Sequence, residues 1–400
     1  MVELHSRYDV IVVGGGPAGS SFVRTLRDLC PDAAVLVLDK ASFPRDKVCG
    51  DALTHTSLPL VGEVFPELGG RIPTESYTRR YTVRFPNGQV FSREDQELDV
   101  IPRRTFDMLL WDASAHDGAT RVEGARVVDV ILDGDRVAGV VAKVDGRTVE
   151  VRASVVVAAD GSNSVVRRKT RTGPPQPPPI AVRQYVSDVP PSDDGLVFII
   201  DPDHHGYFWF FPTVIDGRSS ANVGWFGFGK EQVNARHRLE SHFEDDLVRR
   251  YIGSGRREGK VEAANLSLVP MRHGRVALQR SLGGQGYLLT GDAAGLIHPY
   301  TGEGIAFAIY SGRRAAELVG AAHRSRNGRS PGGPDVDVAA YEADSLEFIR
   351  GVYNLPRTAM LFSLPCVLPA AVRPFYLRSL PVLDVARKAG KRTRAAVTRS

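Results

Sequence analysis

The chain has 400 residues, of which 42% are hydrophobic and 24% are charged, and its formal net charge at pH 7 is +5. These values are those of an ordinary globular protein, and the length favours two domains, because a single hydrophobic core stops growing at smaller sizes. The sequence lacks an apolar run of roughly 18 residues, a secretory signal and a basic stripe with interleaved aromatics, so we expect a cytosolic protein that neither spans a membrane nor binds nucleic acid.

The first predicted element is a short buried strand, Val10–Val13, which three glycines follow at once. Its wholly apolar run is typical of a parallel strand that is covered on both faces. Gly14 permits a tight turn, Gly16 lets the backbone approach a pyrophosphate, and Gly19 lets a helix pack closely on the strand. An ordinary glycine turn is the alternative interpretation of the same three residues.

The residues after the glycines complete a dinucleotide-binding pattern. Residues 20–29 predict a helix with apolar residues on one face, and residues 34–38 predict a second buried strand that ends at Asp39. The N-terminus of the helix offers free N–H groups and the positive end of its dipole to phosphates. Asp39 is placed to accept a hydrogen bond from a ribose hydroxyl.

The next predicted elements are a loop, a helix and a pair of hairpins. Residues 43–51 combine proline, glycine and charges, which predicts a loop beside the nucleotide site. Thr105 can cap a helix that runs to residue 116. Between residues 120 and 157 β-branched residues alternate around two Asp-Gly pairs, at 133–134 and 145–146, so we expect an antiparallel meander inserted in the nucleotide fold.

A second unit follows a buried strand at residues 155–159. The segment 173–179 (GPPQPPP) predicts a stiff linker and a domain boundary. Short strands rich in aromatic and β-branched residues come next, and they predict one antiparallel sheet that walls a pocket: Val197–Ile200, Tyr207–Phe211 and Ala221–Phe226. Residues 236–251 predict a charged helix that faces solvent.

The chain then returns to the first unit. Residues 286–292 (GYLLTGD) predict another buried strand, and a glycine-rich turn and a long helix over residues 304–322 follow it. Residues 327–334 predict a flexible loop, and everything from residue 337 onward predicts helices interrupted by prolines.

Three separated segments predict one shared ligand. Besides the glycine turn, they are 160–167 (DGSNSVVR), a strand end with a capped turn, and 291–305 (GDAAGLIHPYTGEGI). Asp292 at a strand end suits the hydroxyls of a ribityl chain, and residues 302–305 open a helix whose N–H groups can stabilise the anion of a reduced flavin. In this order, the three segments predict FAD.

The order of these motifs resembles that of the para-hydroxybenzoate-hydroxylase-type flavoproteins. Within that group, FPRDKVCGDAL and GYFWFFP resemble the geranylgeranyl reductase family, with its archaeal, plant and menaquinone-reductase members, and the resemblance covers nearly the whole chain. It implies that Arg45 and Arg103 line the FAD site and that Cys49 lies near the isoalloxazine. It further implies that residues 207–212 are the family's YxWxFP substrate-pocket motif. The family's proline three residues before the tyrosine is His204 here, with Pro202 displaced, which leaves the identity of the substrate open.

These inferences assign candidate roles to particular residues. The positions predicted to bind FAD are Gly14, Gly16, Pro17, Ala18, Gly19, Asp39, Lys40, Arg45, Cys49, Gly50, Arg103, Val127, Asp160, Gly161, Ser164, Gly291, Asp292, Pro299, Gly302, Glu303, Gly304 and Ile305. The candidate catalytic residues are Cys49, Tyr207, Trp209 and His298. The predicted substrate pocket contains Tyr207, Trp209, Phe211 and Pro212. The three cysteines, Cys30, Cys49 and Cys366, form no CxxC pair, so we expect neither disulfides nor zinc.

Several of these residues keep a second interpretation. Tyr207, Trp209 and Phe211 share one face of their strand by period two, so that face can line an apolar cavity or be buried like the other face. Cys49 can be a loop thiol without a catalytic task, and His298, a candidate proton donor beside the flavin turn, can be a packing histidine. His204 and His205 are better explained as loop residues.

The predicted fold class is therefore α/β with an α+β insert: a Rossmann-type FAD-binding domain that is discontinuous in sequence, an antiparallel-sheet substrate domain and a C-terminal helical region. The FAD-binding domain takes residues 1–75, 100–173 and 275–330, the substrate domain takes 76–99 and 180–274, and the helical region takes 331–400. Residues 354–399 mix apolar and basic side chains, which fits helices packed on the FAD domain with a basic tail, or an amphipathic surface that meets a membrane peripherally.

The leading functional hypothesis is a reductase in which reduced FAD delivers a hydride to a C=C bond of an isoprenoid or related hydrophobic metabolite. NAD(P)H or a ferredoxin would supply the electrons, because the chain holds no second dinucleotide fingerprint. A flavin monooxygenase of natural-product biosynthesis is the alternative, although Gly295 stands where such hydroxylases commonly have histidine. A flavin halogenase ranks lower, because no lysine lies between Lys47 and Lys143. Nothing supports a non-enzymatic flavin protein.

Overall fold

The computed structural model describes residues 4–352 except for 70–71, 73–75, 87, 95–97, 116–118, 171–179, 202–205, 228–233, 270, 273–274, 277, 279–280, 300 and 326–335. The predictions made for the linker at 173–179, the loop at 327–334 and the residues beyond 352 therefore lie outside the described residues. The same holds for Pro202, His204, His205 and Cys366.

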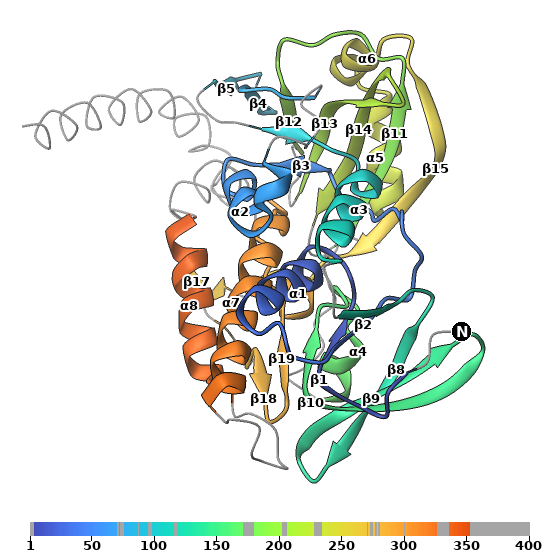
Figure 1. The fold of residues 1–400 in the computed structure, drawn as a ribbon. Helices are drawn as coiled ribbons and strands as arrows, with labels where there is room; N and C mark the ends of the chain where they lie inside the picture. The colour runs from blue at the N-terminus through green and yellow to red at the C-terminus, as the bar shows by residue number, and fades with distance from the viewer. Residues whose placement is uncertain are drawn as a thin grey trace, which may run out of the picture.

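Two large sheets organise the described chain (Figure 1). The first has the order β18-β19-β10-β1-β2-β7, with β9 and β8 attached to β10 by antiparallel pairing. Its strands are β1 (Arg7–Val13), β2 (Val35–Leu38), β7 (Ala119–Val122), β8 (Arg126–Asp133), β9 (Arg136–Val144), β10 (Arg147–Ala158), β18 (Gly283–Gly284) and β19 (Tyr287–Leu289). Neighbours from β19 to β7 along this order are parallel, so their carboxyl ends meet at one edge.

The second sheet has seven strands in the order β15-β11-β14-β13-β12-β4-β5. They are β4 (Tyr81–Arg84), β5 (Val90–Arg93), β11 (Ile180–Ser187), β12 (Leu196–Ile200), β13 (Gly206–Ile215), β14 (Arg218–Gly227) and β15 (Arg256–Asn265). All neighbours are antiparallel except β12 and β4, which run parallel. Two short pairs complete the described strands: β3 (Ala52–Leu53) with β6 (Asp99–Val100), and β16 (Met271–Arg272) with β17 (Arg275–Val276).

The helices cover the first sheet and lie against the second (Figure 1). They are α1 (Pro17–Leu29), α2 (Ser57–Val64), α3 (Arg103–Ala113), α4 (Val165–Lys169), α5 (Ala235–Phe243), α6 (Asp246–Ile252), α7 (Ile305–Ser325) and α8 (Val338–Val352), with the 3-10 turns η1 (Pro66–Leu68) and η3 (Gly291–Ala293). Among the helices described, none is both long enough and apolar enough to pass through a membrane.

The apolar run of β1 is explained by burial on both of its faces. Val10 and Val12 belong to a core cluster that includes residues of α1 and α7, whereas Ile11 and Val13 pack with the β8–β9 hairpin on the other side. A strand that is covered twice has no position for a polar side chain, so its sequence does not alternate. The buried parallel strand predicted at residues 10–13 is confirmed.

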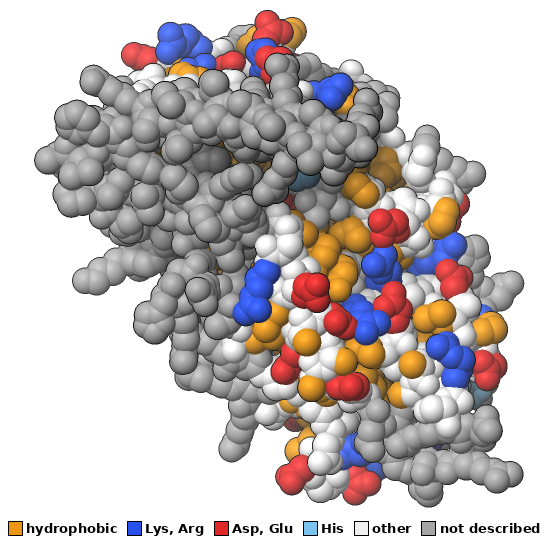
Figure 2. All heavy atoms as spheres, turned by 90° about the vertical axis from the view of Figure 1, so that its left-hand side faces the viewer, with side chains coloured by type: hydrophobic (Ala, Val, Ile, Leu, Met, Phe, Trp, Pro, Cys, Tyr) orange, Lys and Arg blue, Asp and Glu red, His pale blue; other side chains and the backbone are white. Residues whose placement is uncertain are grey.

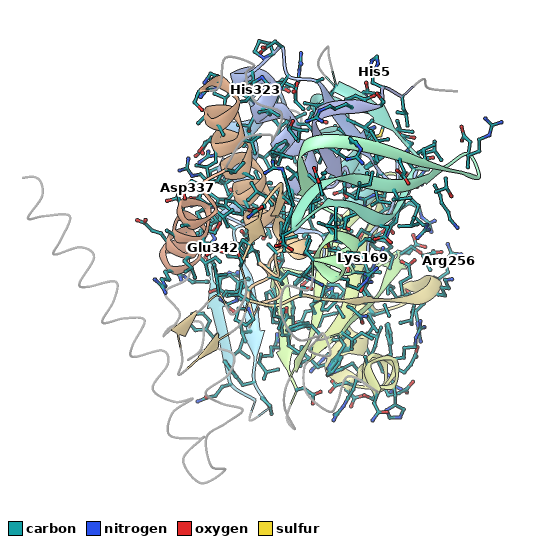
Figure 3. All side chains as sticks on the ribbon, turned by 90° about the horizontal axis from the view of Figure 1, so that it is seen from below. His5, Lys169, Arg256, His323, Asp337 and Glu342 are labelled. Atoms are coloured by element: carbon teal, nitrogen blue, oxygen red, sulfur yellow. The ribbon has the colours of Figure 1, made fainter. Side chains whose placement is uncertain are left out.

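Helix α8 docks on the edge of the first sheet through its polar first turns. Asp337 Oδ1 accepts a hydrogen bond of 2.9 Å from Ala340 N and caps the helix. Glu342 Oε1 accepts hydrogen bonds from Ser281 Oγ and from Leu282 N, next to β18. Figure 3 shows Asp337 and Glu342 at α8, well away from Arg256 on β15. On the face of the molecule that α8 helps to form, basic, acidic and hydrophobic side chains are intermixed (Figure 2).

Most of the predicted elements are confirmed, and three need correction. Residues 119–122 form β7, which pairs in parallel with β2 rather than joining the meander, because a four-residue strand takes its partner from tertiary packing. The helix predicted at 236–251 is two helices, since the side chain of Asp245 accepts from Leu247 N and starts α6. The helix expected at Thr105 begins at Arg103, so Thr105 lies in its first turn.

The packing of α1 on α7 generates a stability prediction. A Cβ on Gly312 of α7 would lie 2.2 Å from Ala18 O of α1, and backbone cannot move aside as a flexible side chain can. We expect Gly312→Ala to lower the free energy of unfolding by about 1–3 kcal/mol, measured by urea denaturation. A Cβ on Gly62 of α2 would have nothing within 4 Å, so Gly62→Ala should stabilise by up to about 1 kcal/mol. Equal effects of the two substitutions would contradict this packing.

Candidate active site

A cavity of about 370 Å³ lies between the carboxyl edge of the first sheet and one face of the second. Its wall is built mainly from three parts of the chain: the loop 47–55, the aromatic face of the second sheet, and the turn that leads into α7. Pro17 of α1 and Arg103 of α3 also line it. Most of the lining side chains are apolar, and among the polar ones are Lys47, Asp51, Arg103, Asp292 and Glu303. Figure 1 shows α2 and α3 between the two sheets.

The three segments predicted to share a ligand do meet, because the strands that precede them are neighbours. β10 pairs in parallel with β1 on one side and with β19 on the other. Their carboxyl ends therefore deliver Gly14, Asp160 and Asp292 to the same edge of the sheet. Arg167 fastens the second segment to the third, since its Nη1 donates to Ala293 O at 2.9 Å and to Asp292 O at 3.2 Å.

The glycines at the end of β1 are required by close backbone contacts. Gly14 has a φ of +102°, and a Cβ there would lie 2.5 Å from Ala159 O. A Cβ on Gly19 would lie 1.9 Å from Gly14 O, so α1 can cross the strand only with glycine at that position. Gly16 differs, because a Cβ there would meet only Arg45 Nη2, at 3.2 Å. Apart from Arg45, no atom of the described residues crowds the backbone of Gly16 at the N-terminus of α1, so a ligand can approach the turn there.

Asp39 has a structural task that its sequence position did not suggest. Its Oδ2 accepts a hydrogen bond of 2.7 Å from Gly15 N, and its Oδ1 accepts one of 2.8 Å from Ala41 N. The carboxylate therefore holds the glycine turn in shape. Each of its oxygens has a second lone pair, so accepting a ribose hydroxyl stays compatible with these bonds.

Two arginines converge on one buried acid of α3. Arg103 donates to Asp107 through Nε and Nη2, both at 2.7 Å, and Arg45 Nη1 lies 2.9 Å from the same carboxylate. Burial alone would lower the pKa of Arg103, but Asp107 and the Cys49 side chain beside it raise the pKa above the usual value. Arg103 is thereby held as a cation on the cavity wall, and Arg45 is held beside Gly16 at the N-terminus of α1.

Asp292 is the acid of the third segment, and it lies at the cavity. Its Oδ2 accepts a hydrogen bond of 2.8 Å from Lys47 Nζ, which joins the loop 47–55 to the end of β19. Burial would raise the pKa of Asp292, but Lys47, with smaller contributions from Arg103 and Arg167, lowers it below the usual range. Asp292 is therefore ionised at neutral pH and available as an acceptor for hydroxyl groups.

The second segment begins with a buried acid and a cap. Asp160 Oδ2 accepts from Val165 N at 2.7 Å, and Ser164 Oγ accepts from Arg167 N at 3.1 Å and caps α4. The predicted strand end with a capped turn is confirmed. Burial raises the pKa of Asp160, and the hydrogen bond from Ser164 partly opposes this rise.

The turn into α7 is braced against both neighbouring walls. Glu303 Oε1 accepts a hydrogen bond of 2.5 Å from Thr54 Oγ1, and Tyr207 OH donates to Thr301 O at 2.5 Å. His298 is fully buried, and its Nδ1 accepts from Thr301 N at 3.0 Å. Burial lowers the pKa of His298 to about 3, so the imidazole is neutral at physiological pH. His298 is not among the described residues that line the cavity, so the proton-donor role considered for it finds no support in its placement.

The two faces of β13 have different surroundings. Phe208 and Phe210 pack with α5 and α6, whereas Tyr207, Trp209 and Phe211 line the cavity. Tyr207 and Phe211 both make edge contacts with Phe198 of β12, with ring centroids 5.4 and 5.1 Å apart respectively. These rings form one continuous surface, which we call the aromatic wall below. Pro212 is partly buried and is not among the described lining residues.

One asparagine ties the aromatic wall to the loop 47–55. Asn222 Oδ1 accepts from Trp209 Nε1 at 2.9 Å, and its Nδ2 donates to Cys49 O at 2.8 Å and to Asp51 Oδ2 at 2.7 Å. Tyr185 OH donates to the same Asp51 oxygen at 2.5 Å. Cys49 itself lines the cavity with a partly exposed side chain.

The predicted residues thus fall into two groups. Those at the cavity wall are Pro17, Cys49, Gly50, Arg103, Tyr207, Trp209, Phe211, Asp292, Gly302, Glu303, Gly304 and Ile305. The remaining predicted residues are not at the cavity wall: Gly14, Gly16, Ala18, Gly19, Asp39, Lys40, Arg45, Val127, Asp160, Gly161, Ser164, Pro212, Gly291, His298 and Pro299. Val127 lies in β8, where its side chain packs in the core of the first sheet.

Sequence reasoning missed several polar residues of the site. Lys47 and Asp51 belong to the motif FPRDKVCGDAL, and Thr54 follows it directly. The motif could therefore have identified them as candidate site residues. Tyr185 and Asn222 lie within strands of the second sheet that carry other polar residues, so no local pattern marks them.

The described residues fit a flavin dinucleotide. The turn at Gly16 leaves the N-terminus of α1 open beside the cation Arg45, which suits a pyrophosphate. Asp292, held ionised by Lys47, suits the hydroxyls of a polyol chain. The first turn of α7 presents backbone N–H groups to the cavity wall at Gly304 and Ile305.

Comparison with known proteins agrees with this fit. A family model described as FAD binding domain matches residues 7–326. The chain is 30% identical over 397 residues to menaquinone reductase of Mycobacterium tuberculosis, covering 94% of this chain and 89% of the relative. It is 33% identical over 320 residues to digeranylgeranylglycerophospholipid reductase 1 of Methanopyrus kandleri, covering 78% of this chain and 80% of that protein. A geranylgeranyl bacteriochlorophyll reductase-like structure from Thermoplasma acidophilum aligns with a TM-score of 0.68 and 25% identity, covering 90% and 88% of the two chains.

The open backbone at Gly16 generates a prediction about cofactor content. Gly16→Val should fold, because only the flexible end of Arg45 must move, but its side chain should occupy the space in front of α1. We expect a normal far-ultraviolet circular dichroism spectrum and little yellow flavin absorbance in the purified variant. Gly16→Ala, with a smaller side chain, should retain more flavin than Gly16→Val. Full flavin content in both variants would contradict a role for this turn in binding.

Proposed function

Since the chain belongs to the geranylgeranyl reductase family of FAD-dependent oxidoreductases, we propose that it reduces carbon–carbon double bonds of an isoprenoid or a related hydrophobic molecule. Bound FAD, once reduced, would supply the hydride. The names of the relatives, a menaquinone reductase and a digeranylgeranylglycerophospholipid reductase, support prenylated lipids and quinones as the substrate class.

The observation that carries this proposal is the composition of the cavity. One side is the aromatic wall of β12 and β13, and the opposite side carries the motifs that resemble FAD-binding segments, from Pro17 to the first turn of α7. An apolar chamber of this size is typical of a small-molecule site that holds part of a long chain. It would also keep water away from the reacting groups.

Different residues would bind the cofactor and the substrate. We propose that Arg45 and the open turn at Gly16 hold the pyrophosphate, that Asp292 accepts from the ribityl chain, and that the first turn of α7 lies against the flavin ring. Tyr207, Trp209 and Phe211 would then hold the apolar substrate against that ring. Cys49 would lie at the junction between cofactor and substrate, because it lines the cavity beside Arg103. NAD(P)H or a ferredoxin would deliver the electrons from outside.

The reductase proposal predicts that no oxygen is needed for turnover. Enzyme reduced by light under anaerobic conditions should become oxidised again when mixed with a geranylgeranyl ether lipid or with menaquinone, each tested separately. The product of a reduced double bond should be heavier by the mass of two hydrogen atoms, and with menaquinone this gain should remain after the quinol has been oxidised back to the quinone. Flavin absorbance follows the first result and mass spectrometry the second.

The alternatives give different products when oxygen, with or without halide, is added to the same mixture. Flavin oxidation that needs oxygen, with a product heavier by one oxygen atom, would establish a monooxygenase. A halogenated product that appears only with halide and oxygen would establish a halogenase. A run without lipid controls for leakage of oxygen.

The two faces of β13 allow a matched test of the aromatic wall. Trp209→Leu should leave flavin content unchanged and slow turnover by about 10- to 100-fold, because the substrate loses its positioning surface. Phe210→Leu, on the face that packs with α5 and α6, should lower stability by about 1 kcal/mol or more and leave turnover unchanged. Loss of flavin from Trp209→Leu would place this residue in the cofactor site instead.

A further inference from the structure

Asp51 is a fully buried acid at the cavity wall, and the proposed cofactor contacts give it no role. It follows Cys49 and Gly50 in the loop and lies directly before β3. Its φ is +65°, a left-handed conformation that is costly for a residue with a side chain. The conformation is held by the hydrogen bond from Ile101 N to Asp51 O, at 3.0 Å, and by the pairing of β3 with β6. The fold thus fixes the direction of this side chain.

The two oxygens of Asp51 have different surroundings. Oδ2 accepts two hydrogen bonds, from Tyr185 OH at 2.5 Å and from Asn222 Nδ2 at 2.7 Å. Oδ1 is buried and has no hydrogen-bond partner among the described residues. A buried carboxylate oxygen without a partner is costly, so such a group calls for an explanation. Protonation removes the charge of the carboxylate and so lowers the cost of burying it. Because Oδ2 already accepts two hydrogen bonds, the proton is placed on Oδ1.

Resting on the proposed function, we propose that Asp51 is the proton donor of the reduction. As one carbon of the double bond accepts a hydride, which brings two electrons, the neighbouring carbon takes the proton of Asp51 Oδ1. Two C–H bonds form; the π bond, the O–H bond and the bond that held the hydride in reduced FAD break, and a carboxylate remains. Tyr185 and Asn222 stabilise that carboxylate through their bonds to Oδ2. Water then returns a proton to it before the next turnover.

Burial and the groups around Asp51 set its pKa above the usual range of an aspartate. Burial raises the pKa of Asp51 to about 6, against the lowering effects of Arg183, Tyr185 and Asn222. Arg183 is itself engaged elsewhere, since it forms ion pairs with Asp46 of the loop and with Glu262 of β15 and stacks on the ring of Tyr185. Asp46 opposes the ionisation of Asp51, which is consistent with the raised value.

The proposal predicts how the rate depends on pH. The donor must carry its proton, so the rate of anaerobic flavin oxidation by the lipid should be highest below the pKa of Asp51 and fall as the pH rises through it. Asp51→Asn should lower this rate by about 100-fold or more and remove that pH dependence, while flavin content stays the same. Asp51→Glu should keep the pH dependence with a smaller loss of rate.

Asp99 provides the matched control. It is another buried acid, on β6, and burial raises its pKa to about 6 as well, but it is not among the described residues at the cavity. Asp99→Asn should therefore leave the rate and its pH dependence unchanged. Infrared difference spectra recorded on either side of pH 6 give a readout without substrate: Asp51→Asn should lose the carboxylic-acid signal of Asp51, and Asp99→Asn should lose that of Asp99.

Tyr185→Phe separates a chemical role of Asp51 from a structural one. Removing the hydrogen bond to Oδ2 should raise the pKa of Asp51, so the fall in rate should move to higher pH. The proposal would be overturned if the rate of Tyr185→Phe fell at the same pH as that of the wild type. It would also be overturned by an Asp51→Asn rate within about threefold of the wild type. If the wild-type enzyme is not oxidised by either lipid, the proposed function fails instead, and the infrared signal of Asp51 still reports whether its proton is present.

Discussion

The close approach of two backbones, at the ends of β1 and β10, is the constraint on which the rest of the structure depends. Gly14 turns the chain with a positive φ, and a Cβ there would lie only 2.5 Å from Ala159 O, so no side chain can be accommodated between the two strands. That turn leads directly into α1, and α1 in turn packs on α7 through Gly312. The contact therefore brings the N-terminal turn of α1 and the carboxyl ends of β10 and β19 to one place.

The loop 47–55 converts this edge of the sheet into one wall of a chamber. Lys47 bonds to Asp292 at the end of β19, Thr54 bonds to Glu303 before α7, and Asn222 of the second sheet bonds to Cys49 O and Asp51. Each bond joins parts of the chain that lie far apart in the sequence. The loop is thus held from both sheets, which fixes this side of the cavity between them.

The hydrogen-bond partners of the polar groups in this chamber influence the pKa of each group. Asp292 is held ionised by Lys47, whereas Asp51 accepts only from the neutral donors Tyr185 and Asn222 and keeps one oxygen without a partner among the described residues. His298, considered from its sequence position as a proton donor, is neutral and braces its own turn. Two acids of the same cavity therefore differ in pKa, because Asp292 is hydrogen-bonded to a cation and Asp51 to neutral groups.

Short-range patterns in the sequence were sufficient for the flavin motifs, the hairpins at 133–134 and 145–146, and the aromatic strand, because glycine geometry and strand period act within a few residues. Local patterns could not place β7 beside β2, divide the helix at Asp245, or distinguish the two faces of β13, since partner choice depends on packing. Tertiary structure alone decided that Tyr185 and Asn222 would meet Asp51, because hydrogen bonds between distant strands leave no periodic trace in a single chain.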